Sequence, residues 1–153
     1  MFGIKKLFSE KNKEKSKSDS LSPSPSVNTD TPYYLIGGEE GTRALSKAFY
    51  QEMSSNIHLQ ELLAVHKEPL ADTEEKFFKY LSGWLGGPPL FENEFGHPRL
   101  RARHLHVKVT KKQRDLWMLC MTKALEKTVE NEELRKGLTQ SFSQLATHMI
   151  NSD

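Results

Sequence analysis

Apolar side chains recur every three or four residues along most of the chain beyond residue 39, which is the period of a helix with one buried face. In the first such stretch Leu45, Phe49 and Met53 lie four residues apart. No stretch shows the sustained period-two alternation of a half-buried strand. The pattern predicts an all-α fold with about five substantial helices and almost no strand.

Turn and capping residues divide this pattern into separate helices. Asp72 is followed three residues later by Glu, and Thr110 by Gln, which is the spacing of a capping box at the start of a helix. Asn131 is expected to cap the last helix, with two glutamates near its positive end. The sequence Gly-Gly-Pro-Pro at residues 86–89 should end the helix that begins at Asp72. We expect residues 90–95 to be irregular.

Composition narrows the class of protein. At 153 residues the chain is long enough for one domain with a single core. Its net charge of +2 argues against binding to polyanions through bulk charge, and its single cysteine, Cys120, excludes an intramolecular disulfide framework. No apolar run approaches the ~20 residues of a membrane-spanning helix, and residues 1–8 do not form a secretory signal. We therefore expect a soluble, cytoplasmic protein.

Residues 1–30 differ in composition from the rest of the chain. They are rich in lysine, serine and proline, which predicts a flexible, disordered extension in front of a folded domain at residues 31–153. The apolar positions within residues 1–8 would allow a short amphipathic turn that makes a weak contact with a membrane surface or a partner. The alternative is that these residues belong to the disordered tail.

The segment 96–104 places three arginines and a terminal histidine behind a glycine–proline turn. If a helix follows the proline, Leu100 and His104 share one of its faces. Arg99 and Arg103 then form a second row. In this arrangement the imidazole is suited to ligate a metal, and the guanidinium groups are suited to hold carboxylates. The pattern points to a planar cofactor that bears acid groups.

Two other interpretations of this segment stay open. A basic helix is often a solvated face or a patch that binds phosphate. His104 and His106 also have the spacing of a metal site on a strand, although the chain offers one cysteine and no second cluster of ligands. The local pattern does not decide among these interpretations.

Three side chains place polar groups within apolar stretches. Tyr50 adjoins Phe49, His66 ends a segment that is broken by a proline, and Trp117 brings an indole N–H to the inner face of a later helix. A buried Tyr or Trp needs a hydrogen-bond partner, which the backbone can supply. If the three side chains converge on one cavity, they form a site for a polar diatomic molecule or peroxide. Sequence spacing does not show whether they converge.

Several uncommon motifs occur in order along the chain: LSGWLGGP at residues 81–88, GHPRLRARH at residues 96–104 and RDLWMLCM at residues 114–121, with GG at 37–38 and FY at 49–50 upstream. With these motifs the chain resembles the group II truncated haemoglobins over about residues 31–150. The resemblance implies a two-over-two helical sandwich that encloses haem b. It also implies that the element before the proximal helix is mostly loop.

The resemblance assigns roles to residues at matching positions. His104 matches the proximal ligand of the haem iron, and Tyr50 and Trp117 match the distal tyrosine and tryptophan. His66 falls at a distal position where the family varies among Tyr, His and Phe, and it would join them as a hydrogen-bond donor. His106 stands where family members commonly have proline, which places an extra imidazole near the propionate edge of the haem.

Other matching positions surround the haem. Thr73 and Phe77 match distal-helix residues that face the iron. Arg103 matches a residue near a haem propionate, and Arg99 and Arg101 are additional propionate candidates.

The resemblance implies an iron that is open to O2, NO, CO or peroxide. Hydrogen-bond donors in a dry pocket would slow the release of O2. Slow release favours NO dioxygenation, peroxide reduction or sensing over bulk transport, and redox chemistry requires a reductase. Tyr50 or His66 is a candidate for the sixth iron position at rest. We expect a monomer or a homodimer.

The competing interpretation is a cofactor-free helical module that binds nucleic acid or an acidic protein through its arginines. Such binding would weaken steeply with salt. The chain does not offer exposed aromatic residues between its basic ones, which base stacking would need. We therefore expect no nucleic-acid binding.

Overall fold

The computed structural model describes residues 28–153. Within these residues the chain is helical and has no strand, as the hydrophobic pattern predicts. None of the described helices is both long and apolar enough to cross a membrane. The predicted extension at residues 1–30, with its membrane-surface segment at residues 1–8, lies outside the described residues apart from residues 28–30.

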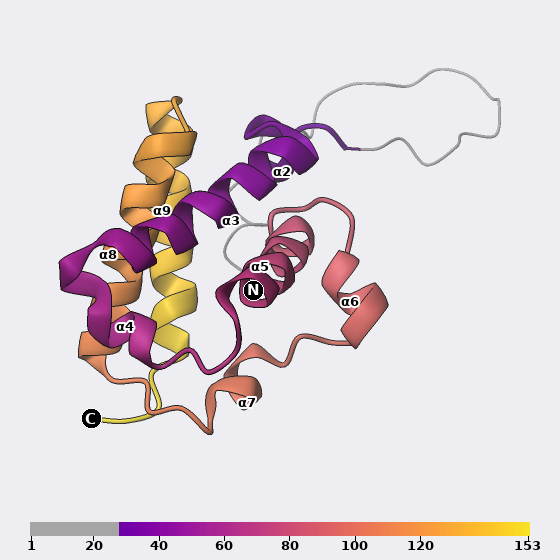
Figure 1. The fold of residues 1–153 in the computed structure, drawn as a ribbon. Coiled ribbons are helices and arrows are strands. Elements are labelled where there is room, and N and C mark those ends of the chain that lie inside the picture. The colour runs from indigo at the N-terminus through magenta and orange to yellow at the C-terminus, as the bar shows by residue number, and fades with distance from the viewer. Residues whose placement is uncertain (1–27) are drawn as a thin grey trace, which may run out of the picture.

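In the part of the chain that the structure describes, four long helices form the framework, one short helix precedes them and four short helical segments connect them (Figure 1). The long helices are α3 (Gly38–Ser55), α5 (Leu70–Trp84), α8 (Lys111–Thr128) and α9 (Glu132–His148). The short segments are α2 (Pro32–Leu35), the 3-10 helix η1 (Ile57–Leu59), α4 (Gln60–Ala64), α6 (Leu90–Phe95) and α7 (Leu100–His104).

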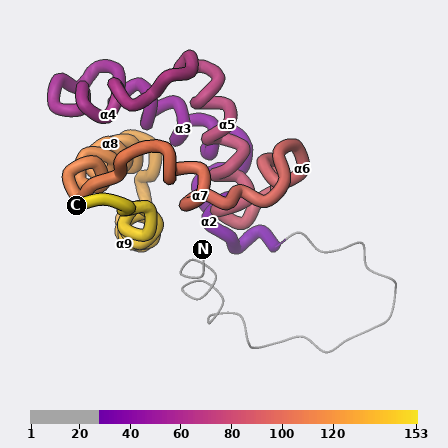
Figure 2. The backbone as a smooth tube through the Cα atoms, turned by 90° about the horizontal axis from the view of Figure 1, so that it is seen from below, coloured from indigo at the N-terminus to yellow at the C-terminus, as the bar shows by residue number. Residues whose placement is uncertain are grey.

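The long helices pack as two pairs. Helix α3 packs against α5 and also against α8, and α8 packs against α9. Figure 2 shows the same pairs from below, with α9 viewed nearly end-on. The core between them is apolar and closed to solvent; its fully buried side chains include Leu45, Phe49, Met53, Leu81, Leu85, Met121, Leu125, Leu138 and Phe142. The predicted two-over-two helical sandwich is therefore confirmed.

Two of the predicted helix starts are confirmed by their caps. The hydroxyl of Thr110 accepts a hydrogen bond from the Gln113 N–H at 3.2 Å. The side-chain oxygen of Asn131 accepts one from the Leu134 N–H at 2.9 Å. Each cap satisfies a backbone donor that the first turn of a helix leaves unpaired.

The start predicted at Asp72 is wrong. Helix α5 begins at Leu70, and Asp72 lies within its first turn. The carbonyl of Pro69 accepts hydrogen bonds from the N–H groups of Asp72 and Thr73, at 3.1 and 3.2 Å. Pro69 is the N-cap residue, with φ of −55° and an extended ψ of 134°. Because its carbonyl accepts the first bonds of the helix, the helix begins at Leu70, before the capping-box residue.

The expectation of irregular backbone at residues 90–95 is also wrong, because these residues form α6. The N–H of Asn93 donates to the Pro89 carbonyl at 3.0 Å. Phe91 and Phe95 lie one turn apart, with ring centroids separated by 4.9 Å. The segment ends at Gly96, whose φ of 80° is unfavourable for other residues. The four-residue spacing of the two phenylalanines was the helical signal.

Gly41 makes a close contact that only glycine permits. It lies inside α3, where alanine is ordinarily favoured by about 1 kcal/mol, but a Cβ there would overlap the carbonyl of Ile36. We expect Gly41→Ala to lower the free energy of unfolding by about 2 kcal/mol, measured by urea denaturation. Gly83→Ala in α5 is the control, since its Cβ would lie 3.4 Å from Pro89 and should be tolerated. Equal stability of the two variants would contradict the close contact.

Candidate functional site

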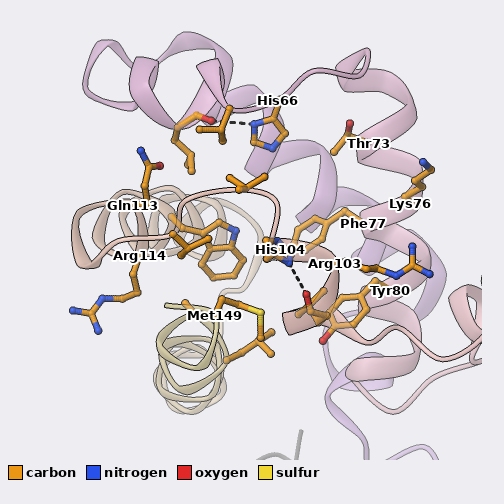
Figure 3. A pocket seen from close by; sticks show the side chains of 18 of the residues that line it. His66, Thr73, Lys76, Phe77, Tyr80, Arg103, His104, Gln113, Arg114 and Met149 are labelled. Atoms are coloured by element: carbon orange, nitrogen blue, oxygen red, sulfur yellow. Dashed lines mark hydrogen bonds between the residues drawn. The ribbon is translucent and has the colours of Figure 1, made fainter. Parts of the chain in front are cut away.

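A cavity of about 420 Å³ opens among α3, α5, α7, α8 and α9 (Figure 3). Its volume lies in the range of small-molecule sites, ~300–1,000 Å³. Most of its walls are apolar or aromatic, with a few polar groups facing in. The predicted site residues that line it are Tyr50, His66, Thr73, Phe77, Arg103, His104, His106 and Trp117. The structure thus brings together predicted site residues from four helices and two loops.

His104 faces the cavity from the end of α7. Leu100, one turn earlier, lines the cavity as well, as the shared helical face predicts. The Nδ1–H of His104 donates to the Leu100 carbonyl at 2.7 Å (Figure 3). Because a carbonyl can only accept, Nδ1 carries the proton. The neutral imidazole therefore keeps Nε2 free of a proton, which is the form that can ligate a metal.

Of the three arginines near His104, only Arg103 lines the cavity. The Nε of Arg103 donates to the Pro98 carbonyl at 2.7 Å. Arg101 is exposed and donates to the backbone carbonyls of His148, the last residue of α9, and of Ile150. Arg99 is exposed and does not line the cavity. Arg101 lies two helical positions, about 200°, from Arg103, and Arg99 precedes α7 with a left-handed φ of 42°. The expected array of three guanidinium groups around one imidazole therefore does not form.

Tyr50 and Trp117 converge within the cavity, which sequence spacing could not show. Tyr50 lies on α3 and Trp117 on α8, and the ring of Phe49 contacts both, with centroid distances of 5.1 and 5.3 Å. Phe77 from α5 approaches the same two rings at 5.8 and 6.5 Å. Burial raises the pKa of the Tyr50 hydroxyl well above its usual value, so the phenol stays protonated and can donate a hydrogen bond.

His66 lines the cavity near Tyr50, and the centroids of their rings are 6.0 Å apart. Its Nδ1 lies 3.0 Å from the Leu62 carbonyl and must carry the proton. In the neutral ring Nε2 is then an acceptor, so the expected role of His66 as a hydrogen-bond donor does not fit this neutral form. His66 and His104 thus share one arrangement, in which a carbonyl four residues earlier fixes the tautomer.

Tyr80 is a cavity residue that the sequence analysis missed. It is 7% exposed, lines the cavity, and its hydroxyl has no hydrogen-bond partner within residues 28–153. Burial raises the pKa of this hydroxyl as well. The signal was present, because Tyr80 follows Phe77 by three residues and so shares its helical face. Met149 also lines the cavity, at the end of the apolar stripe of α9.

The cavity suits an iron porphyrin by the chemistry of its walls. His104 offers one imidazole nitrogen, and the described residues contain no group of three or more His, Cys, Asp and Glu side chains that could hold a bare metal ion. A metal ligated by His104 would therefore need a cofactor that supplies its other ligands. Apolar walls suit a macrocycle, while Arg103 and Lys76 at the rim suit carboxylates.

Comparison with known proteins decides the family. The sequence model of the bacterial-like globin family matches residues 31–151. A curated group 2 truncated haemoglobin of Bacillus subtilis is 36% identical over 122 residues, which are 80% of this chain and 89% of that protein. This chain is a group II truncated haemoglobin.

Solved structures agree with this assignment to the group II truncated haemoglobins. The cold-adapted truncated haemoglobin of Pseudoalteromonas haloplanktis has a TM-score of 0.79 at 47% identity, covering 80% of this chain and 99% of its own. The group II 2-on-2 haemoglobin of Agrobacterium tumefaciens has a TM-score of 0.77 at 38% identity. The match covers 87% of this chain and 100% of that haemoglobin's chain. As a member of this family, the truncated haemoglobin binds haem b and small gaseous ligands such as O2.

Proposed function

We propose that this globin holds its iron through Nε2 of His104 and retains ligands through Tyr50 and Trp117, for redox chemistry or sensing rather than for bulk transport. The haem supplies one open coordination position for O2, NO, CO or peroxide. The observation that carries the proposal is the convergence of a phenol and an indole around Phe49 and Phe77, within the cavity that His104 faces.

The two distal donors would act by direct hydrogen bonding to the ligand. Tyr50 is 8% exposed and its hydroxyl stays protonated. The Trp117 indole N–H can only donate. Donors in a site that excludes water stabilise negative charge on a ligand more strongly than water does. This favours slow release of O2 and reactions such as NO dioxygenation or peroxide reduction, which need a reductase as electron donor.

The rim of the cavity would hold the propionates. Arg103 is our main candidate, because its guanidinium group lines the cavity and is held over the Phe91 ring at 5.1 Å. His106 lines the same rim and is a second candidate. Arg99 and Arg101 do not line the cavity, so we leave them out of the propionate contacts.

His66 has a role that follows from its tautomer. We propose that in the ligand-free pocket its Nε2 accepts the hydrogen bond of the Tyr50 hydroxyl, and that a bound ligand takes over this single donor. The same lone pair makes His66, along with Tyr50, a candidate for the sixth iron position when no external ligand is present. A high-spin, five-coordinate ferrous spectrum in the absence of ligand would exclude either residue as a sixth ligand.

Absorption spectroscopy tests the proposed function. We expect the purified protein to show a Soret band that shifts when dithionite reduces the iron, and apoprotein titrated with haemin to regain that band. A protein without a Soret band after haemin addition would contradict the proposal. That result would favour the cofactor-free helical module that binds through its arginines. A salt titration of binding to nucleic acid would then test this alternative.

A further inference from the structure

Helix α7, which carries His104, has little packing of its own. It is five residues long, none of its residues is buried, and its first turn has no side-chain cap. Arg99, just before it, adopts a left-handed conformation with φ of 42°, which is unfavourable for a residue other than glycine. Hydrophobic packing therefore does not account for the position of His104, and other contacts must hold it.

Asn151, which follows α9, makes those contacts. Its Nδ2 donates to the backbone carbonyls of His104 and Val107, at 3.1 and 3.0 Å. Its Oδ1 accepts from the Val109 N–H at 2.9 Å, and its own N–H donates to the Val109 carbonyl at 3.0 Å. The Asn151 side chain thus makes its hydrogen bonds to the backbone of the loop that begins at the His104 carbonyl.

Arg101 makes the reciprocal connection from α7 to the same segment. One terminal nitrogen of its guanidinium group donates to the carbonyls of His148 and Ile150, at 2.9 and 3.4 Å. Met149, between these two residues, lines the cavity together with His104 (Figure 3). The end of α9 and the end of α7 are therefore tied by hydrogen bonds in both directions, on the wall of the cavity.

We propose that Asn151 is a positioning residue for His104, an inference that rests on the role of His104 as the iron ligand. The last carbonyls of a helix lack intrahelical donors; that of His104 accepts from the Val107 N–H at 3.0 Å and from the Asn151 amide at 3.1 Å. Outer partners that orient a metal-bound histidine change the strength of its metal bond. Without the Asn151 amide the end of α7 keeps the bonds of Arg101 and of the Val107 N–H but loses its bonds to the Asn151 side chain, so the imidazole of His104 is held less firmly.

Resonance Raman spectroscopy of the ferrous holoprotein just after photolysis of its CO complex tests this proposal, because it reports the iron–histidine stretching band. In Asn151→Asp the side chain can still accept from Val109 but can no longer donate to the two carbonyls; Asn151→Ala loses all three side-chain bonds. We expect both variants to shift and broaden the band. Haem transfer to an apomyoglobin acceptor should accelerate by about tenfold.

The matched control is Asn131→Ala, which removes the cap at the opposite end of α9 and so lowers stability without touching the loop after His104. An unshifted band in both Asn151 variants, or an equal shift in Asn131→Ala, would overturn the positioning role. If the wild-type protein shows no iron–histidine band, or if His104→Ala retains it, the proposed function fails instead, so the two failures are distinguishable.

Discussion

Replacement of His104 by alanine is expected to abolish the Soret band of the purified protein. In the neutral form of His104 the Nε2 carries no proton, because the Leu100 carbonyl holds the proton on Nδ1. Removal of this imidazole leaves the iron without its protein ligand on that wall, so that apolar contacts and the proposed propionate contacts at the rim would have to hold the macrocycle. Absorption spectra of the purified protein and of apoprotein titrated with haemin would measure the loss.

His106→Ala is the control for this experiment. It removes a second imidazole that lines the same cavity and should leave the Soret band in place. Addition of free imidazole to His104→Gly should restore a histidine-like spectrum, because the vacated space accepts the missing ring. An intact Soret band in His104→Ala, or its loss only in His106→Ala, would show that His104 is not the proximal ligand.

Trp117→Phe and Tyr50→Phe are each expected to raise the O2 dissociation rate by about tenfold. Each change keeps an aromatic ring among Phe49 and Phe77 but removes one hydrogen-bond donor. Stopped-flow mixing of the oxygenated protein with a CO solution gives the rate. The double variant shows whether the two donors act on the same ligand, since shared partners produce non-additive effects.

Trp84→Phe is the control for the distal variants. Trp84 stacks on Phe142 with centroids 4.4 Å apart and does not line the cavity. Its replacement should therefore leave the O2 dissociation rate unchanged. If Trp117→Phe also left that rate unchanged, the indole would have no part in ligand retention.

Local rules of the chain were enough to predict the helices and several of their ends. Thr110 and Asn131 cap helices because each cap depends on a residue three positions away. Pro69 shows where such rules compete, since its carbonyl accepts the first bonds of α5 and so starts the helix ahead of Asp72. The four-residue spacing of Phe91 and Phe95 in α6 is likewise a local signal of a helix.

The geometry of the site depends on contacts between distant parts of the chain. Tyr50 and Trp117 lie on different helices, and only the packing of α3 against α8 places both on the wall of one cavity. The tautomer of His66 depends on where the Leu62 carbonyl points. Asn151 has no distinguishing pattern in the sequence, because its partners lie more than forty residues earlier along the chain.

The sparse packing of α7 also bears on how the protein acquires its cofactor. Segments with few buried contacts open locally at a lower free-energy cost than the core does, and α7 buries none of its residues. The walls formed by α3 and α8, in contrast, contain fully buried side chains such as Phe49 and Met121. Haem loading is therefore expected to proceed through the α7 wall, with amide hydrogen exchange fastest there in the apoprotein and slowed once the haem is in place.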